Sequence, residues 1–228
     1  MVIFKKNILR FYWLILLVHC ILILAGRPYE QHLTKLMLIP VLIFGLISPV
    51  DPFKNNLKMI LAISGLLFSF VGDLLLIFPE TIFFIAGMVA FMLTHICYTV
   101  FFIKQSGAFI TRSGYSLVAG LTVPLLAIIS LLMAKPDFGD LSIPIAVYIV
   151  MITIMSVSAS SLLNKNEWKK IALICFIPGA SFFIISDTIL ALNHFLYHNK
   201  ILDLSVMLTY GIAQFFIARG FMHIKESL

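Results

Sequence analysis

Residues 57–78 have the sequence LKMILAISGLLFSFVGDLLLIF, in which Lys58 and Asp73 are the only charged residues. An α-helix needs about 20 predominantly apolar residues to cross the hydrocarbon core of a bilayer, which is roughly 30 Å thick. Asp73 lies well inside the run, where a carboxylate costs about 2.5–3.5 kcal/mol on insertion scales. The stretch therefore predicts a membrane-spanning helix with an aspartate that needs a reason to be there.

The composition of the whole chain agrees with this interpretation. Of its 228 residues, 61% are hydrophobic and 11% are charged, and the mean hydropathy is +1.09. Soluble globular proteins carry about 25% charged residues, so the composition excludes a water-soluble chain. At about 20 residues per span plus short loops, no length remains for an appended catalytic domain. We therefore expect a single integral membrane domain over residues 1–228.

Similar apolar runs recur along the chain, bounded by polar, Pro or Gly residues. They cover residues 11–25, 33–48, 57–78, 81–103, 114–134, 141–163, 170–193 and 202–222. The first run follows a basic start, as in a signal peptide, but it lacks a small-x-small cleavage site and is interpreted as a span. The first two runs are short, so we expect their helices to extend into the charged flanks, and the tight link between residues 78 and 81 predicts an antiparallel hairpin. The predicted fold class is all-α, a polytopic membrane protein with a bundle of eight transmembrane helices.

The basic residues predict the orientation of these spans. With the N-terminus inside, the inner segments hold twelve Lys and Arg residues and the outer segments hold only Arg27, Lys35, Lys135 and Lys200. This split follows the positive-inside rule, so we expect both termini to be cytoplasmic, in a bacterial inner (plasma) membrane. The basic residues that give the formal net charge of +6 are spread along the chain and form no basic stripe, so we expect no nucleic-acid partner.

Two parts of the chain echo each other. FSFVGDLLL at 68–76 resembles FFIISDTIL at 182–190, and the tripeptide MLT follows at 92–94 and again at 207–209. The similarity suits a four-plus-four parallel duplication with its axis along the membrane normal. The alternative is chance similarity between apolar helices.

Asp73 and Asp187 are the two acids that lie well inside predicted spans. Each precedes the expected outer end of its span by five or six residues, which places it roughly 7–9 Å below that edge at about 1.5 Å per residue. If the two spans are neighbours, the carboxyls face one cavity about 4–9 Å apart. Repulsion and partial desolvation would then keep one carboxyl protonated while the other ionises, which supplies a general acid and a general base.

The structural alternative is that each aspartate only holds helices together. Its partners would then be Ser69, Ser186, Thr188 or a backbone carbonyl. Two such acids at matched depth favour the functional interpretation, because ionisable residues inside a membrane are functional candidates by default.

Other polar side chains in the spans are candidate parts of the same site. Lys35, at the outer end of the second run, either pairs with an aspartate, binds a phosphate or extends to the headgroups. His95 and Tyr98 share one helix face, and Tyr210 and Gln214 form a similar pair at i and i+4. A lone intramembrane His is more often an interhelical hydrogen-bond donor than a ligand, so His95 is a supporting candidate.

The sequence predicts no metal and no cofactor. His194 and His198 have the best ligand spacing, but no HExxH motif accompanies them, so a zinc site there is a minor alternative. Cys20, Cys97 and Cys175 lie in apolar runs without CxxC spacing, which disfavours disulfides and a cysteine metal site. GxSxG, Walker and dinucleotide motifs are absent from the sequence, so serine acylation, nucleotide hydrolysis and hydride transfer have no support.

Two signatures in the chain resemble a known family. Residues 69–76, SFVGDLLL, and 84–98, FIAGMVAFMLTHICY, look like the pattern SxxGDxxL…FxxGxxxFxxxHxxY of the YhhN-like membrane proteins, the lysoplasmalogenases. Residues 179–187, GASFFIISD, followed by 210–214, YGIAQ, are similar to the second signature, GAxxFxxSD…YxxAQ. The resemblance covers the second to the eighth span. One departure is Lys35-Leu36, where the family has Lys-Pro.

The resemblance implies hydrolysis of the vinyl ether of 1-alkenyl lysophospholipids to a fatty aldehyde and a glycerophospho-ethanolamine or glycerophosphocholine. It implies that Asp73 and Asp187 are the essential acids. The expected substrate-binding residues are Lys35, His95, Tyr98, Ser186, Tyr210 and Gln214. The expected partners are the lysophospholipid substrate and the membrane lipids.

The chemistry fits the expected depth of the two acids. Protonation of the β-carbon of a vinyl ether generates an oxocarbenium ion, which a carboxylate stabilises as in glycoside hydrolysis. The vinyl ether of a lysolipid lies just below its headgroup, near the depth expected for Asp73 and Asp187. A small proton-coupled transporter and a lipid-binding membrane protein are the alternatives, because two intramembrane carboxylates also suit a carrier.

Overall fold

Long apolar segments form helices here because lipid offers no partners to backbone N–H and C=O groups, which must bond within the segment. The computed structural model describes residues 2–47, 57–108 and 114–226, and within these ranges every regular element is helical. The elements are α1 (Val2–Ala25), α2 (Pro28–Ile47), α3 (Leu57–Leu75), α4 (Thr81–Ser106), α5 (Gly114–Ala134), η1 (Gly139–Leu141), α6 (Ser142–Ser161), η2 (Leu162–Asn164), α7 (Asn166–Ile171), η3 (Ala172–Phe176), α8 (Ile177–Leu192), η4 (Asn193–Tyr197) and α9 (Lys200–Glu226). Eight helical segments in the described ranges are long and apolar enough to cross a membrane, which confirms the predicted eight-helix polytopic membrane protein.

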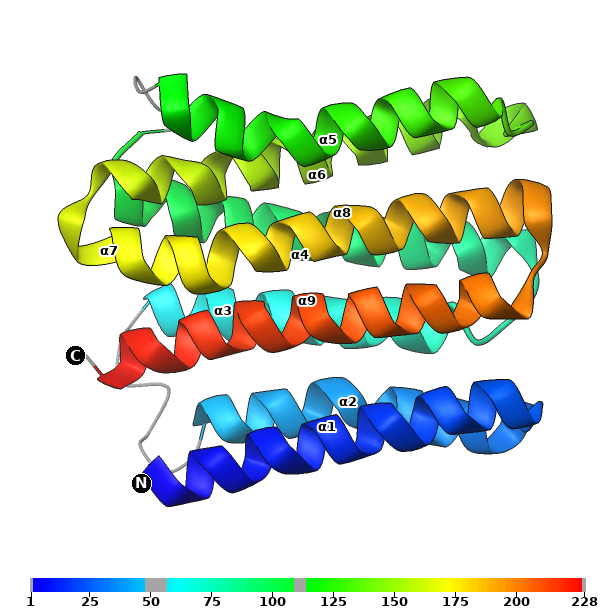
Figure 1. Ribbon diagram of the computed structural model, residues 1–228, viewed down its shortest axis with the longest axis horizontal. Coiled ribbons are helices and arrows are strands. Elements are labelled where there is room, and N and C mark those ends of the chain that lie inside the picture. Colours follow the sequence, from blue (N-terminus) through cyan, green and yellow to red (C-terminus); the bar gives the residue numbers. More distant parts are fainter. Residues whose placement is uncertain (1, 48–56, 109–113, 227–228) are drawn as a thin grey trace.

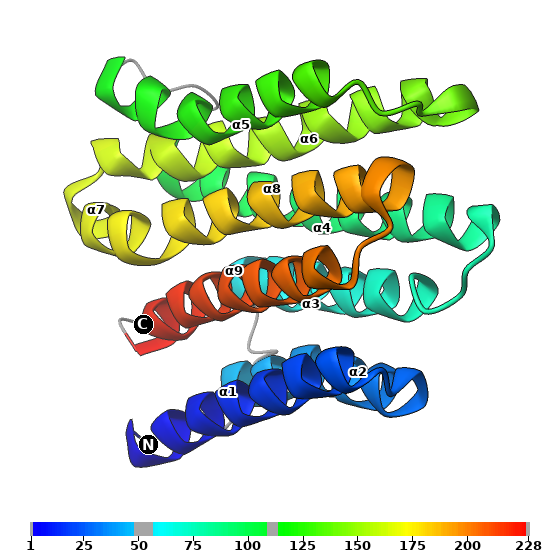
Figure 2. The same cartoon turned by 45° about the vertical axis from the view of Figure 1, so that its right-hand side comes forward.

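The spans run back and forth, and both ends of the chain lie at the same end of the bundle (Figures 1 and 2). The opposite end, on the right in Figure 1, carries residues 26–27, 76–80 and 135–138 and is termed the distal end. Helices α1 and α2 begin upstream of their apolar runs, at Val2 and Pro28, as expected for short spans. Helices α3 and α4 form the expected hairpin.

Helix α3 ends three residues earlier than the apolar run predicts, at Leu75 instead of residue 78. The backbone N–H groups of Ile77 and Phe78 bond to the carbonyls three residues earlier, at 3.3 and 3.2 Å, and so form tight turns. Pro79 follows, and a proline disfavours helical backbone at the residue before it. Asp73 therefore lies in the last turn of α3, nearer the helix end than expected.

The seventh span, Asn166–Tyr197, is continuous but changes its winding. The π-helical turns η3 and η4 flank α8, and π-turns within helices are often found at functional sites. At the start of η4, the Asn193 side chain donates to Asp203 and accepts from the backbone N–H of Asn199, both at 2.6 Å. These bonds hold the α8–α9 hairpin together at the distal end.

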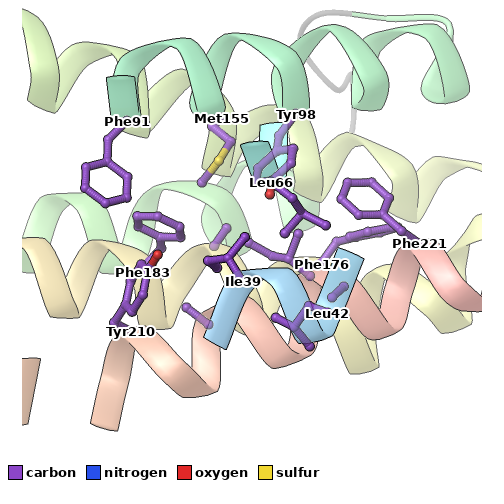
Figure 3. Packing of buried hydrophobic residues seen from close by; sticks show 14 of the residues in the cluster. Ile39, Leu42, Leu66, Phe91, Tyr98, Met155, Phe176, Phe183, Tyr210 and Phe221 are labelled. Atoms are coloured by element: carbon purple, nitrogen blue, oxygen red, sulfur yellow. The ribbon is translucent and has the colours of Figure 1, made fainter. Parts of the chain in front are cut away.

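Helices α3, α4, α8 and α9 form the centre of the bundle, with the α1–α2 and α5–α6 hairpins on either side (Figures 1 and 2). Figure 3 shows the rings of Phe91, Phe183 and Tyr210 meeting in this core. They pack edge to face, with centroids 5.7–6.1 Å apart. Gly72 makes room for them, because a Cβ atom there would lie 2.7 Å from the Phe91 ring. The close approach of α3 and α4 holds the neighbouring Asp73 at the centre.

Candidate active site

A cavity of about 400 Å³, termed the polar cavity, lies near the distal end between α1, α2, α3, α4, α8 and α9. Asp73 and Asp187 both line it, together with Lys35 and Tyr210. Its other polar lining side chains are His19, Gln31, His32, Ser186, His194 and Asp203. The two aspartates share this space although α3 packs chiefly against α4 and α8 packs chiefly against α9.

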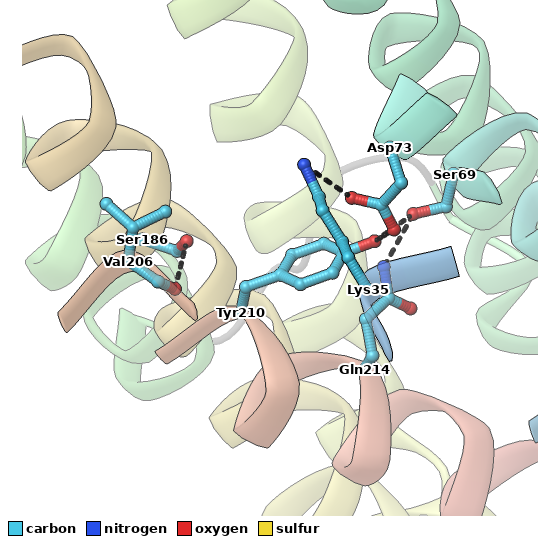
Figure 4. Close-up of polar contacts among 7 residues, drawn as sticks. All are labelled: Lys35, Ser69, Asp73, Ser186, Val206, Tyr210 and Gln214. Atoms are coloured by element: carbon cyan, nitrogen blue, oxygen red, sulfur yellow. Dashed lines mark hydrogen bonds and ion pairs between the residues drawn. The ribbon is translucent and has the colours of Figure 1, made fainter. Parts of the chain in front are cut away.

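Asp73 lies in a buried network of charge and hydrogen bonds (Figure 4). The Nζ atom of Lys35 lies 3.6 Å from its Oδ1 atom, and the Tyr210 hydroxyl donates to its Oδ2 atom at 2.5 Å. The Lys35 side chain is 15% exposed, so water screens this ion pair only weakly. A cation at this distance favours the ionised carboxylate.

Two further side chains hold Tyr210 in position. Tyr210 donates its single hydroxyl proton to Asp73, so the Ser69 hydroxyl, 3.1 Å away, donates to the Tyr210 oxygen. The amide nitrogen of Gln214 donates to Ser69 at 2.6 Å. Gln214, Ser69, Tyr210 and Asp73 are all buried. The first three form a chain of hydrogen-bond donors that ends at the Asp73 carboxylate.

Asp187 has different partners. The Tyr148 hydroxyl, from α6, donates to its Oδ2 atom at 2.5 Å, and the Nε2 atom of His95 lies 3.0 Å from that hydroxyl. Because the Tyr148 proton is used in the bond to Asp187, His95 donates from Nε2. Among the residues that the structure describes, Asp187 has no Lys or Arg within ion-pair distance.

Three of the expected substrate-binding residues line the polar cavity: Lys35, Ser186 and Tyr210. Lys35 pairs with Asp73, which is one of the roles that the sequence left open. Ser186 donates its proton to the Val206 carbonyl at 3.0 Å and lies apart from the Asp73 network (Figure 4).

The other three, His95, Gln214 and Tyr98, do not line the polar cavity, and their contact with substrate stays a prediction. Gln214 lies one helical turn from Tyr210, farther from the distal end, and among the described residues its side chain hydrogen-bonds only to Ser69. His95 hydrogen-bonds to the Tyr148 hydroxyl. Tyr98 is fully buried, and its ring packs against Phe221 at a centroid separation of 5.3 Å. Each turn moves a side chain about 5.4 Å along the helix, which is enough to leave the cavity.

Tyr148 is the functional candidate that the sequence interpretation missed. Its hydroxyl contacts Asp187 directly, and it lies on a helix that has no part in the family signatures quoted above. The available signal was weak: Tyr148 is the only aromatic residue in the apolar run 141–163. His19, Gln31 and His32 were also missed, because the ends of spans are commonly polar.

The possible zinc pair does not form a regular helical ligand pair. His194 lines the polar cavity, but its ring stacks on Phe84 with centroids 4.3 Å apart. His198 follows the π-turn η4 and has a left-handed backbone conformation, φ 51°. No group of three or more His, Cys, Asp or Glu side chains is placed to hold a metal ion within the described ranges.

The chain is similar to proteins whose curated names are lysoplasmalogenase. It is 32% identical over 165 residues to the lysoplasmalogenase TMEM86A of Homo sapiens, a match that covers 71% of this chain and 65% of the relative. It is 28% identical over 168 residues to a lysoplasmalogenase of Mycobacterium bovis, with 72% and 61% covered. The chain thus spans less than two thirds of the length of these relatives. No solved structure matches it.

The family model that matches this chain describes the YhhN family and covers residues 30–221. This range extends from α2 to α9 and includes both aspartates and all the side chains that hydrogen-bond to them. The chain therefore belongs to the YhhN family.

Proposed function

We propose that this protein cleaves the vinyl ether bond of lysoplasmalogens, with Asp73 and Asp187 as catalytic base and acid. One observation carries the proposal: two carboxyl groups, each with a tyrosine donor, line the same cavity. The names of the relatives support the substrate class. The cavity also lies near one end of the bundle, which suits a bond just below a lipid headgroup.

The reaction needs one proton donor and one proton acceptor. A carboxylic acid gives its proton to the β-carbon of the vinyl ether, where the electrons of the double bond form the new C–H bond. The carboxylate partner stabilises the resulting oxocarbenium ion and takes a proton from the water that adds to the α-carbon. Collapse of the hemiacetal breaks the bond between the α-carbon and the glycerol oxygen. The glycerol oxygen takes the proton that the carboxylate partner had removed from water. The hydroxyl proton of the hemiacetal returns to the group that had protonated the β-carbon.

The partners of the two aspartates favour Asp187 as the acid and Asp73 as the base. Lys35 lies 3.6 Å from Asp73 and favours its ionised form. Asp187 has the neutral donor Tyr148 and no ion-pair partner among the described Lys and Arg residues, so it holds a proton more readily. One proton shared by two nearby carboxyls also avoids the repulsion of two negative charges.

We further propose that the distal end faces the outside and that both termini are cytoplasmic. The twelve-to-four split of basic residues supports this orientation. The orientation is tested with two variants of a cysteine-free protein, one with a single cysteine at position 165 and one with a single cysteine at position 200. Intact cells that carry each variant are treated with a membrane-impermeant thiol reagent. Labelling at Lys200 alone is expected, and labelling at Lys165 alone would reverse the orientation. A bacterial inner membrane as the location stays a prediction.

Aldehyde release by purified protein in detergent tests the activity. We expect a 1-alkenyl lysophospholipid to yield a fatty aldehyde without any membrane gradient, and the matched 1-alkyl lysophospholipid, which lacks the double bond, to yield none. A folded protein that releases no aldehyde from ethanolamine or choline substrates would refute the hydrolase. Uptake of the intact lysolipid after reconstitution would then identify a carrier.

A further inference from the structure

A second cavity, termed the apolar cavity, lies between α4, α5, α6 and α8. Its volume is about 70 Å³. Helix α5 contributes Ala127 and Ile128 to its wall, and α6 contributes Ile149 and Ile152. These helices form the side of the bundle away from α1 and α2 (Figures 1 and 2).

The apolar cavity adjoins the polar cavity at Asp187. Asp187, Leu76, Phe84, Phe91 and Leu190 line both spaces, so the carboxyl group stands at their border. On one side of this border lie Lys35 and the polar side chains near the distal end, and on the other side the wall consists mainly of hydrocarbon.

The few hydroxyl groups in the wall of the apolar cavity are already bonded. Thr153 and Thr188 each donate to the carbonyl four residues earlier in their own helix, both at 2.7 Å. Tyr148 donates to Asp187. A ligand in this cavity therefore finds one acidic group at its entrance and apolar contacts beyond it, which is the pattern that a hydrocarbon chain ending in a reactive group requires.

We infer that the apolar cavity binds the first part of the alkenyl chain, and this inference rests on the proposed function. In a vinyl ether the carbon that accepts the proton is the one bonded to the rest of the chain. The acid must therefore stand where the chain begins, and the base must stand on the side of the glycerol and headgroup. Asp187 borders the apolar cavity and Asp73 pairs with Lys35 in the polar cavity, as this orientation requires.

The size of the cavity sets how much of the chain it holds. About 10–15 Å³ of cavity volume is needed to hold one water molecule. The apolar cavity therefore accommodates about five groups of the size of a methylene. The lining residues Pro124 and Leu131 are seven positions apart on α5, which corresponds to about 10 Å along the helix. The remainder of a long chain extends beyond the cavity into the bilayer.

Photo-crosslinking tests the location of the chain without relying on hydrolysis. The probe is a 1-O-alkyl lysophosphatidylcholine with a diazirine on the fifth carbon of its alkyl chain. It has no double bond and so persists in the site. Mass spectrometry is expected to find the label on segments 124–131 and 145–153, and an excess of 1-alkenyl lysophosphatidylcholine should reduce it at least about tenfold.

Two substitutions on neighbouring positions of α5 sharpen the test. Ala127→Phe fills the apolar cavity and should reduce the competed label about tenfold or more, because added bulk in an apolar pocket excludes the ligand. Leu126→Phe changes a lipid-facing side chain that is 58% exposed, and it should leave the label unchanged. If Ala127→Phe does not fold, Ala191→Leu fills the same cavity from α8.

The outcomes separate the inference from the proposed function. Label confined to lipid-facing residues, or label that neither competitor nor filling variant reduces, overturns the chain site. Competed label in the cavity of a protein that releases no aldehyde keeps the chain site and refutes the hydrolase. Aldehyde release by a protein whose cavity takes no label keeps the hydrolase and overturns the chain site.

Discussion

The surroundings of the two aspartates differ although both side chains line the polar cavity. Asp73 accepts a hydrogen bond from Tyr210 and pairs with the Lys35 ammonium. Asp187 accepts a hydrogen bond from Tyr148 and borders the apolar cavity. The same side chain thus meets a cation in one place and hydrocarbon in the other, and such a difference is what divides paired carboxyls into an acid and a base.

The two networks also cross between the halves of the chain. His95 and Tyr210 occupy equivalent positions, directly after the two MLT tripeptides. Tyr210, in the second half, donates to Asp73 in the first half. His95, in the first half, contacts Tyr148, which donates to Asp187 in the second half. The crossed pattern fits a four-plus-four duplication, which stays a prediction.

Removal of either carboxyl is expected to have the largest effect. Asp73→Asn and Asp187→Asn should each lower aldehyde release about 100- to 10,000-fold, the range for loss of general acid or base catalysis. The double variant should lose little more than either single variant, because the proposed mechanism uses the two groups as a unit. Purified variants in the detergent assay measure this, with Asp140→Asn in the exposed η1 turn as the matched control. Losses that multiply would show that the carboxyls act independently.

Lys35→Met removes the charge that distinguishes Asp73 from Asp187. We expect turnover to fall roughly a hundredfold, because loss of one partner from a shielded ion pair leaves the other charge uncompensated. Lys35→Arg keeps the charge and should recover much of the loss. Lys135→Met, at an exposed position of the distal end, serves as the control. Wild-type turnover in Lys35→Met would remove the basis for calling Asp73 the ionised partner.

The two tyrosines should respond unequally to loss of their hydroxyl groups. A hydrogen bond to a charged group contributes about 1.5–3 kcal/mol, and one between neutral groups contributes about 0.5–1.5 kcal/mol. Tyr210→Phe should therefore lower turnover roughly 10- to 100-fold, and Tyr148→Phe roughly 2- to 10-fold. Turnover of the two variants, measured side by side, tests this prediction. A larger loss in Tyr148→Phe would mean that Asp73 is the acid and Asp187 the base.

The smallest effects are expected for the side chains behind the tyrosines. Gln214→Leu and His95→Leu should each lower turnover about two- to tenfold, because each removes one neutral hydrogen bond. Gln214 Oε1 and His95 Nδ1 are buried without a partner among the described residues, so the substitutions also remove an unsatisfied acceptor. Melting temperatures should therefore stay within about 4 °C of the wild type. A loss as large as that of an Asp variant would mean direct contact with substrate.

Residue patterns were sufficient to predict most of the fold. The run 57–78 and its seven counterparts mark the spans, because a helix in lipid satisfies its backbone within the segment and needs no partner to do so. Helix ends were less predictable. The apolar run continues through Phe78, but α3 ends at Leu75, where tight turns lead into Pro79. Hydropathy does not report such turns, since Ile77 and Phe78 are as apolar as the helix before them.

The sequence by itself determined the eight spans, their alternating directions and the two aspartates as the acids inside them. Only the tertiary structure decided that Lys35 pairs with Asp73, that Tyr148 donates a hydrogen bond to Asp187 and that Gln214 donates one to Ser69. Helical periodicity determines which side chains share a face, but it does not determine which helix that face meets. Apolar spans resemble one another in composition, so their partners depend on close packing, such as that of Gly72 against Phe91.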